Sequence, residues 1–333
     1  MAGTFVFRFR PLEEIDQKGK NMNKSVLNKT IEKILPEILE GVKQNREANK
    51  TAVISGTRYT LPLEGRTIDI AYYPAEEKHA PLIVAAHGGG FLFGGCALDD
   101  ELWVNMTKVL DVNVASIDYR QSPDVMDEEC LNDMYDSILY LIGHSQDFGF
   151  DPDHVSVFGA SAGGNLAAAL AIKAGMTKAF RLDNQILMYP FLDGYTDPDE
   201  KGEGSFTGLL PHVMNRLHFS PERSADPLLS PVFASVEMLK GLPAAIVSYC
   251  EYDNLRPEAQ KYCQMLKEAG VPVAEFYAEK MPHGYIENGF KDHFSDIEMN
   301  MLGEHAKDLI ESGQLHSTSL RTLEFIKDNM VRP

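Results

Sequence analysis

The stretch Val155-Ser-Val-Phe-Gly-Ala-Ser-Ala-Gly-Gly164 decides the fold of this chain, because it joins an apolar strand to an Ala-rich helix through a serine between glycines. Ser161 stands there in a Gly-x-Ser-x-Gly frame. A serine on a sharp strand-to-helix turn brings neighbouring backbones very close, so Gly159 and Gly163 avoid clashes that any Cβ would cause. The following helix directs free N–H groups towards the serine oxygen, where negative charge would develop. The alternative is a Gly-rich turn that only packs a helix on a sheet.

Short, nearly continuous apolar runs recur on both sides of this turn. They are Leu82–Ala86, Val112–Ile117, Val155–Phe158, Ile186–Tyr189, Ala244–Tyr249 and Val273–Tyr277. Segments with helical periodicity lie between most of them or close the chain, namely Leu131–Ile142, Asn165–Ala174, Glu258–Ala269 and Ser319–Met330. Apolar runs without alternation suit strands that are covered on both faces. The sequence therefore predicts one α/β domain over residues 1–333, with a mostly parallel sheet and helices on both of its faces.

Two segments stand outside this strand–helix alternation. The first comprises about fifty residues at the N-terminus, where helical spacing over Ser25–Val42 contains Pro36, which is expected to kink or split the helix. A hairpin of Thr57–Leu63 and Thr67–Tyr73 is predicted after it. The second segment, Asp193–Ser230, is heavy in Gly, Pro and charge. An insertion of that length between two strands is expected to form a lid or cap over a site.

Composition excludes several classes of partner and cofactor. Lys and Arg number 31 against 49 Asp and Glu, and the net charge of −18 opposes attraction to nucleic acid or to anionic membranes. No apolar stretch approaches the roughly 20 residues of a membrane span, and Met1–Pro11 is too charged for a signal peptide. Four cysteines that lie far apart, without a C-x-x-C pair, predict buried or semi-buried thiols and a cytoplasmic location, with a chance disulfide as the alternative. No His/Cys/carboxylate cluster has metal-site spacing, so no metal is expected.

A glycine-rich loop is the second chemical element. Pro81-Leu-Ile-Val-Ala-Ala-His-Gly-Gly-Gly-Phe91 is an apolar strand that ends in three consecutive glycines. Such a loop can make backbone N–H groups converge on one point, as an oxyanion hole requires. Phosphate binding is the weaker interpretation, because no Lys follows as in a phosphate loop, and Phe93 stands where a dinucleotide fingerprint would need its third glycine.

A serine nucleophile needs a base, and the base needs an orienting acid. His283, in Met281-Pro-His-Gly-Tyr285, follows one predicted strand, and Asp253 follows another. In open parallel sheets catalytic groups gather at the carboxyl ends of the strands. The chain order Ser161, Asp253, His283 is the order typical of hydrolases with a nucleophile elbow. Each residue alone could be structural, but the joint arrangement favours a catalytic triad.

These elements, together with Asp118-Tyr-Arg-Gln-Ser-Pro123, resemble the hormone-sensitive-lipase-like (HGGG) branch of the α/β-hydrolases, from roughly Thr67 to Phe290. The resemblance implies an α/β-hydrolase fold, with Ser161 as nucleophile, His283 as general base and acid, and Asp253 as orienting acid. It also implies an oxyanion hole, whose N–H groups belong to Gly89, Gly90 and Ala162. It further implies a structural role for His87, and a helical cap built from about residues 1–50 and 193–230.

The predicted function is hydrolysis of carboxylic esters through an acyl-enzyme. Because Asp193–Ser230 is polar, small soluble esters with short acyl chains, such as acetyl esters, are the expected substrates, with Phe91 and Tyr195 as candidate substrate-binding residues. An apolar groove for longer chains is the alternative, lined by Phe91, Leu92, Phe93, Tyr195, Phe206, Leu209 and Leu210. The same machinery could serve a lipase, an amidase or an acyltransferase. A non-catalytic ligand receptor is disfavoured, since His283 is retained. The sequence leaves a homodimer open.

Overall fold

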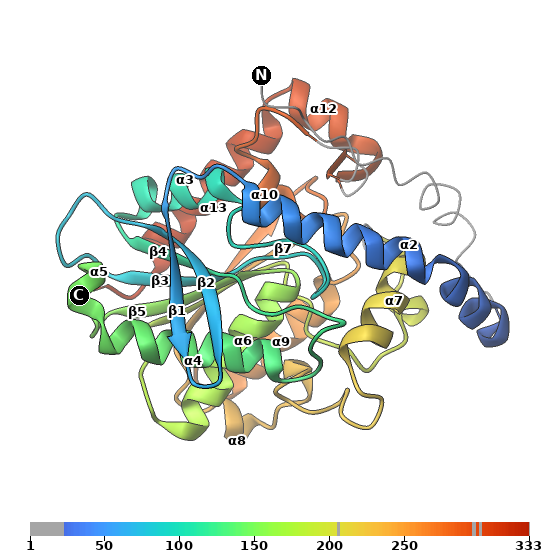
Figure 1. Cartoon of the computed structure of the whole chain (residues 1–333), viewed down its shortest axis with the longest axis horizontal. Helices are drawn as coiled ribbons and strands as arrows, with labels where there is room; N and C mark the ends of the chain where they lie inside the picture. The colour runs from blue at the N-terminus through green and yellow to red at the C-terminus, as the bar shows by residue number, and fades with distance from the viewer. Residues whose placement is uncertain (1–22, 205–206, 295–297, 300–301, 333) are drawn as a thin grey trace.

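The computed structural model describes residues 23–204, 207–294, 298–299 and 302–332, and is built around one eight-stranded sheet (Figure 1). The strands are β1 (Thr57–Leu63), β2 (Arg66–Tyr73), β3 (Leu82–Ala86), β4 (Asn113–Ile117), β5 (Val155–Ala160), β6 (Asn184–Met188), β7 (Ala244–Cys250) and β8 (Val273–Ala278). Their order is β1-β2-β4-β3-β5-β6-β7-β8. Only β2 runs antiparallel to its neighbours β1 and β4; the other pairs are parallel. The predicted α/β class with a mostly parallel sheet is confirmed.

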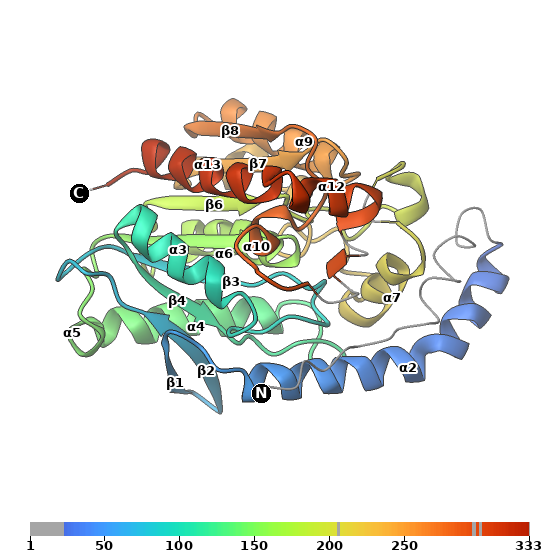
Figure 2. The same ribbon diagram turned by 90° about the horizontal axis from the view of Figure 1, so that it is seen from above.

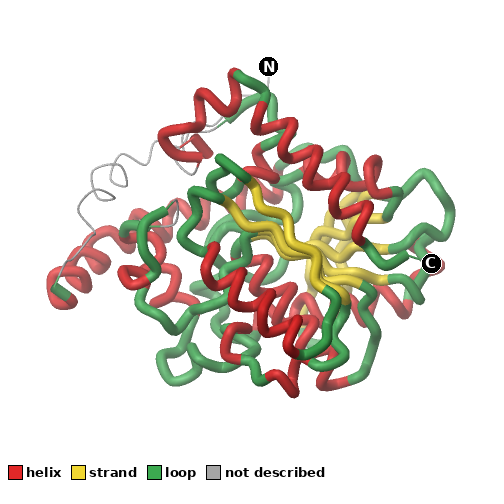
Figure 3. Tube along the Cα trace, turned by 180° about the vertical axis from the view of Figure 1, so that it is seen from behind, coloured by secondary structure: helices red, strands yellow, loops and turns green. Residues whose placement is uncertain are grey.

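Helices cover both faces of this sheet, as the views from above and from behind show (Figures 2 and 3). The helices α4 (Glu129–Gly143), α6 (Ala162–Thr177) and α9 (Arg256–Glu268) share one hydrophobic core with one face. The helices α3 (Asp100–Leu110) and α13 (Gln314–Asn329) share a second core with the other face. Shorter helices connect these layers, namely α5 (Ser145–Phe148), α8 (Val236–Leu239), α10 (Tyr285–Asn288) and α12 (Ala306–Glu311).

The continuous apolar runs in the sequence arise because helices cover both faces of the sheet. Successive side chains of a strand point to opposite faces. In β5, Val155 and Val157 accordingly lie in the first core, whereas Phe158 and Ala160 lie in the second. Both faces of the strand must therefore be apolar, and the polar alternation of a half-exposed strand is absent from β5.

The helices α2 (Lys24–Thr51) and α7 (Leu209–His218) lie side by side away from the sheet and share a third, smaller core. Apolar residues at helical spacing, from Leu27 to Val42, supply the α2 side of that core. Pro36 does not split α2, although Figure 2 shows its first turns inclined to the rest. Of the two segments expected to form a cap, residues 1–22 and 205–206 lie outside the described residues.

The C-terminal half of α2 is fastened to the loop after β4. Arg46 forms an ion pair with Asp124 at 2.6 Å and donates to the carbonyl of Ser122 at 3.0 Å. Asn49 is buried and donates to both carboxylate oxygens of Asp118 at 2.9 Å. These contacts hold α2 against the same end of the sheet as the glycine-rich loop.

All four cysteines are buried and unpaired, as predicted. Among the helices of the described residues, none combines the length and the apolar character that crossing a bilayer would need.

Candidate active site

Ser161 occupies a strained turn between β5 and α6. Its backbone has φ 56° and ψ −117°, a region that non-glycine residues rarely adopt. A Cβ on Gly163 would lie 2.6 Å from the carbonyl oxygen of His87, and one on Gly159 would lie 2.7 Å from the backbone nitrogen of Gly164. Both distances are far shorter than van der Waals contact, and in both cases the obstacle is backbone. The glycines of the frame are therefore required for the reason that the sequence suggests.

The structure brings the three predicted triad residues together. The Nε2 of His283 lies 2.8 Å from the Oγ of Ser161, and its Nδ1 lies 2.7 Å from the Oδ2 of Asp253. The other carboxylate oxygen of Asp253 accepts a hydrogen bond from the backbone N–H of Leu255 at 3.0 Å, which fixes the carboxylate plane. All three side chains are buried. Because Asp253 follows β7 and His283 follows β8, neighbouring strands deliver them to the turn after β5.

The glycine-rich loop folds back on itself beside Ser161. Gly89 and Gly90 have φ of +110° and +62°, and the carbonyl of Gly89 accepts the N–H of Phe93 at 2.9 Å. Among the described residues, the N–H groups of Gly89, Gly90 and Ala162 have no hydrogen-bond acceptor. Buried N–H groups are usually paired, so these three donors, in the turn at Ser161 and in the loop beside it, are available to bind an anionic oxygen.

His87 supports this loop from below. Its Nδ1 lies 2.7 Å from the carbonyl oxygen of Gly88, its ring stacks on Tyr119 at 4.2 Å, and Tyr119 donates to the carbonyl of His87 at 2.8 Å. Burial lowers the pKa of His87, which keeps the imidazole neutral. These contacts are all within the loop and its support, and none leads to Ser161.

The helix α7 closes over the same loop. A Cβ on Gly90 would lie 2.5 Å from the Sδ of Met214, so Met214 packs directly against Gly90. The ring of Phe91 is fully buried and stacks on His218 of α7 at 3.7 Å. Tyr195 is 62% exposed and packs edge-on against Phe233. Phe91 can thus influence substrate only through the loop that it supports, and Tyr195 lies at the surface.

Three further residues lie near the site and were not predicted from the sequence to belong to it. Tyr189 packs its ring against His283 at 4.8 Å and follows β6 directly, so its place at a strand end was the available signal. No sequence pattern around Met214 predicts its place at the site, because its contact with Gly90 depends on how α7 packs against the glycine-rich loop. Glu287 lies on α10 with its Oε2 buried, and the only sign of it in the sequence is an acidic residue close after His283.

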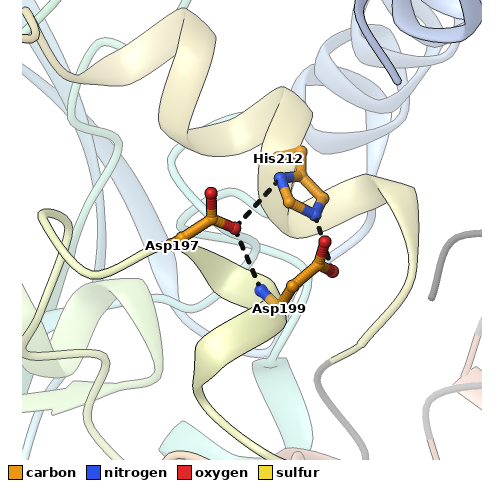
Figure 4. A group of neighbouring side chains, drawn as sticks. All are labelled: Asp197, Asp199 and His212. Atoms are coloured by element: carbon orange, nitrogen blue, oxygen red, sulfur yellow. Dashed lines mark hydrogen bonds and ion pairs between the residues drawn. The ribbon is translucent and has the colours of Figure 1, made fainter. Parts of the chain in front are cut away.

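One group within the described residues has side chains that could hold a metal ion, namely Asp197, Asp199 and His212 (Figure 4). The Nε2 of His212 lies 3.1 Å from Asp199, and its Nδ1 lies 4.0 Å from Asp197. A metal would need both carboxylates on the side of one ring nitrogen. Here they flank opposite nitrogens, which suits an imidazole that is hydrogen-bonded to Asp199 and lies at ion-pair distance from Asp197. The group fastens the insertion before α7 to α7 itself.

Comparison with known proteins agrees with this fold. A family model described as the alpha/beta hydrolase fold matches residues 83–287. An arylesterase of Saccharolobus solfataricus is 30% identical over 236 residues, which are 68% of this chain and 74% of the relative. The carboxylic ester hydrolase LipN of Mycobacterium tuberculosis is 32% identical over 65% of this chain and 60% of its own length. The solved structure of an esterase from Pyrobaculum calidifontis has a TM-score of 0.71 at 25% identity, covering 90% of this chain and 94% of that one.

Proposed function

The chain belongs to the α/β-hydrolase family and is a carboxylesterase-type hydrolase, and from that premise we propose that it is a serine esterase that works through an acyl-enzyme. The observation that carries the proposal is the unbroken hydrogen-bonded path from Asp253 through His283 to Ser161, with distances of 2.7 and 2.8 Å. Nucleophile, base and orienting acid are thus within the reach that proton transfer needs.

In the first half of the reaction, the Oγ of Ser161 attacks the ester carbonyl carbon while its proton passes to the Nε2 of His283. Asp253 holds the imidazole in the tautomer with its proton on Nδ1 and stabilises the cation that forms. The carbonyl oxygen becomes an oxyanion, which the N–H groups of Gly89, Gly90 and Ala162 stabilise by about 3 kcal/mol per donor. The imidazolium then returns its proton to the leaving alcohol, and the acyl group stays on Ser161.

In the second half, water replaces the alcohol and the same groups repeat their roles. His283 takes a proton from the water as it attacks the acyl-enzyme, and then protonates Ser161 as the carboxylic acid departs. The balance is one ester and one water consumed for one alcohol and one acid released. No step in this cycle needs a metal or an organic cofactor.

For the substrate, we infer small esters with short acyl chains. Met214 packs against Gly90, where the carbonyl oxygen would bind, so α7 limits the space beside the reacting carbonyl. In this proposal α2 and α7, from within residues 1–50 and 193–230, form a cap. Their shared apolar core includes Leu92 of the glycine-rich loop, so the buried apolar residues of both helices pack against each other and the loop and are not free to bind a long chain.

The deciding experiment compares wild-type protein with Ser161→Ala in p-nitrophenyl acetate hydrolysis and in labelling by a fluorophosphonate probe. We expect the variant to lose at least about 10³-fold in turnover, because a member of the triad is removed, and to lose all labelling. Circular dichroism should show an unchanged fold. Near-wild-type turnover in the folded variant would assign the nucleophile elsewhere.

A further inference from the structure

Glu287 lies beneath the glycine-rich loop, close to the nucleophile but outside the triad. It belongs to α10, four residues after His283. Gly88 lies close to both Glu287 and Ser161. A Cβ built on Gly88 would lie 3.3 Å from the Oε1 of Glu287 and 3.7 Å from the Cβ of Ser161. The carboxyl oxygen therefore lies at most about 7 Å, the sum of these distances, from the Cβ of Ser161.

The charges around this carboxyl do not favour its ionisation. The cation of the group, Lys291, lies 4.0 Å from Asp99 and 2.6 Å from Glu298, so two other carboxylates already share it. Glu101 of α3 is exposed, and its negative charge acts on Asp99. His87, which approaches from the loop after β3, is neutral because burial lowers its pKa.

Burial acts in the same direction as these charges. The Oε2 of Glu287 is buried and has no hydrogen-bond partner among the described residues. An ionised oxygen without a partner is costly to bury, whereas a protonated one is tolerated. Burial, with Asp99 next in size, raises the pKa of Glu287 to about 8, and burial also raises that of Asp99. Because Lys291 lies beside Asp99, the proton of this pair resides on Glu287.

We propose that Glu287 acts as an uncharged carboxyl beneath the oxyanion loop, and that its ionisation in alkaline solution suppresses ester hydrolysis. The inference rests on the proposed serine mechanism. Its physical basis is repulsion, since a carboxylate within about 7 Å of the nucleophile opposes the negative charge that develops on the substrate oxygen. Glu287 thus acts through the field at the oxyanion site and needs no contact with substrate.

The size of the effect follows from Coulomb's law. The upper bound of about 7 Å between the Glu287 carboxyl and the Cβ of Ser161 sets the scale. Two unit negative charges that far apart, in an effective dielectric of about 20, repel by about 2 kcal/mol, which slows the reaction on the order of tenfold to fiftyfold. The loss should develop as pH rises through about 8, where Glu287 ionises. The wild-type kcat/KM should therefore fall on the alkaline side.

Glu287→Gln tests this directly, because glutamine keeps the shape and cannot ionise. The ratio of kcat/KM at pH 9.5 to that at pH 7 should be at least tenfold higher in Glu287→Gln than in wild type. Glu101→Gln is the matched control: it removes an exposed negative charge of neighbouring α3 and should reproduce the wild-type profile. Asp99→Asn should move the alkaline limb to lower pH, because removing its charge makes Glu287 easier to ionise.

Thermal unfolding supplies a second readout. A carboxyl whose pKa is raised by folding does not destabilise the protein in strongly acid solution, where it is protonated in both the folded and the unfolded state. The stability that it costs grows as pH rises from 4.5, the ordinary pKa of a glutamate, to about 8. The difference in Tm between Glu287→Gln and wild type should therefore change in favour of the variant as pH rises from 4.5 to about 8. A role in packing alone would leave the difference constant.

The outcomes separate this inference from the proposed function. If Ser161→Ala is inactive but the alkaline limb persists unchanged in Glu287→Gln, Glu287 is not its source and the inference fails alone. The inference also fails if Asp99→Asn leaves the limb where it was, even should Glu287→Gln not fold. If Ser161→Ala stays active, the serine mechanism itself fails.

Discussion

Met214→Ala should extend the acyl chains that this esterase accepts. Met214 packs on Gly90, at the place where the proposed oxyanion hole holds the carbonyl oxygen. Its side chain therefore occupies space next to the carbon from which an acyl chain would grow. In wild type we expect kcat/KM to fall beyond about four to six acyl carbons, because overpacking costs about 1–3 kcal/mol.

The size of the change follows from the atoms removed. Truncation to alanine deletes Cγ, Sδ and Cε, which leaves room for about three methylenes. Each methylene buried there contributes about 0.8 kcal/mol, or nearly fourfold in kcat/KM, so three of them contribute on the order of fiftyfold. The optimum should move by about three carbons towards longer chains. Met214 is also 2% exposed, so its truncation should cost about 2–5 kcal/mol of stability.

The assay is a p-nitrophenyl ester series from acetate to palmitate, measured below the temperature at which the variant begins to unfold. Leu209→Ala is the matched control, because Leu209 is buried in the same core of α7 and should lose comparable stability without opening the site. A wild-type optimum at eight carbons or longer would refute the small-pocket reasoning. An unchanged profile in Met214→Ala, or an equal shift in Leu209→Ala, would place the acyl chain elsewhere.

Two predictions concern the scaffold. Gly163→Ala should destabilise the protein by about 3 kcal/mol or more in urea unfolding and abolish activity, because its Cβ would meet the backbone of Ala86 and His87, whereas Gly143→Ala, with open space around it, should be close to neutral. Wild-type stability of Gly163→Ala would contradict the steric account of the elbow. Lys201→Met should cost about 3–5 kcal/mol of stability at pH 8, because buried Glu258 loses its cationic partner at 3.0 Å. Burial raises the pKa of Glu258 to about 7, so the loss of stability should shrink at pH 6, where the carboxyl is protonated. The double variant Lys201→Met/Glu258→Gln should recover part of the lost stability. A loss that does not depend on pH would show that the unpaired Glu258 carboxylate is not its cause.

Much of the sheet could be predicted because its strands are buried on both faces. Such strands leave continuous apolar runs, and Leu82–Ala86 has the same bounds in the sequence and the structure. Helix ends were less visible: α2 continues to Thr51 through polar residues whose partners, such as Asp118, lie far along the chain. The helix α7 was hidden in a segment that reads as irregular, because its ten residues are stabilised chiefly by packing against α2.

Some residues of the site could likewise be predicted from the sequence, and others could not. Ser161, Asp253 and His283 could be found from sequence because each follows its own strand, and parallel strands bring their carboxyl ends to one edge. Glu287 and Met214 carry no such marker, since their roles arise only where α10 and α7 meet the glycine-rich loop. Parallel strands thus determine which groups react, whereas the docking of helices determines the charge beneath the loop and the space beside it. In this esterase, pH response and acyl selectivity should therefore change with substitutions on α10 and α7 that leave all three triad residues in place.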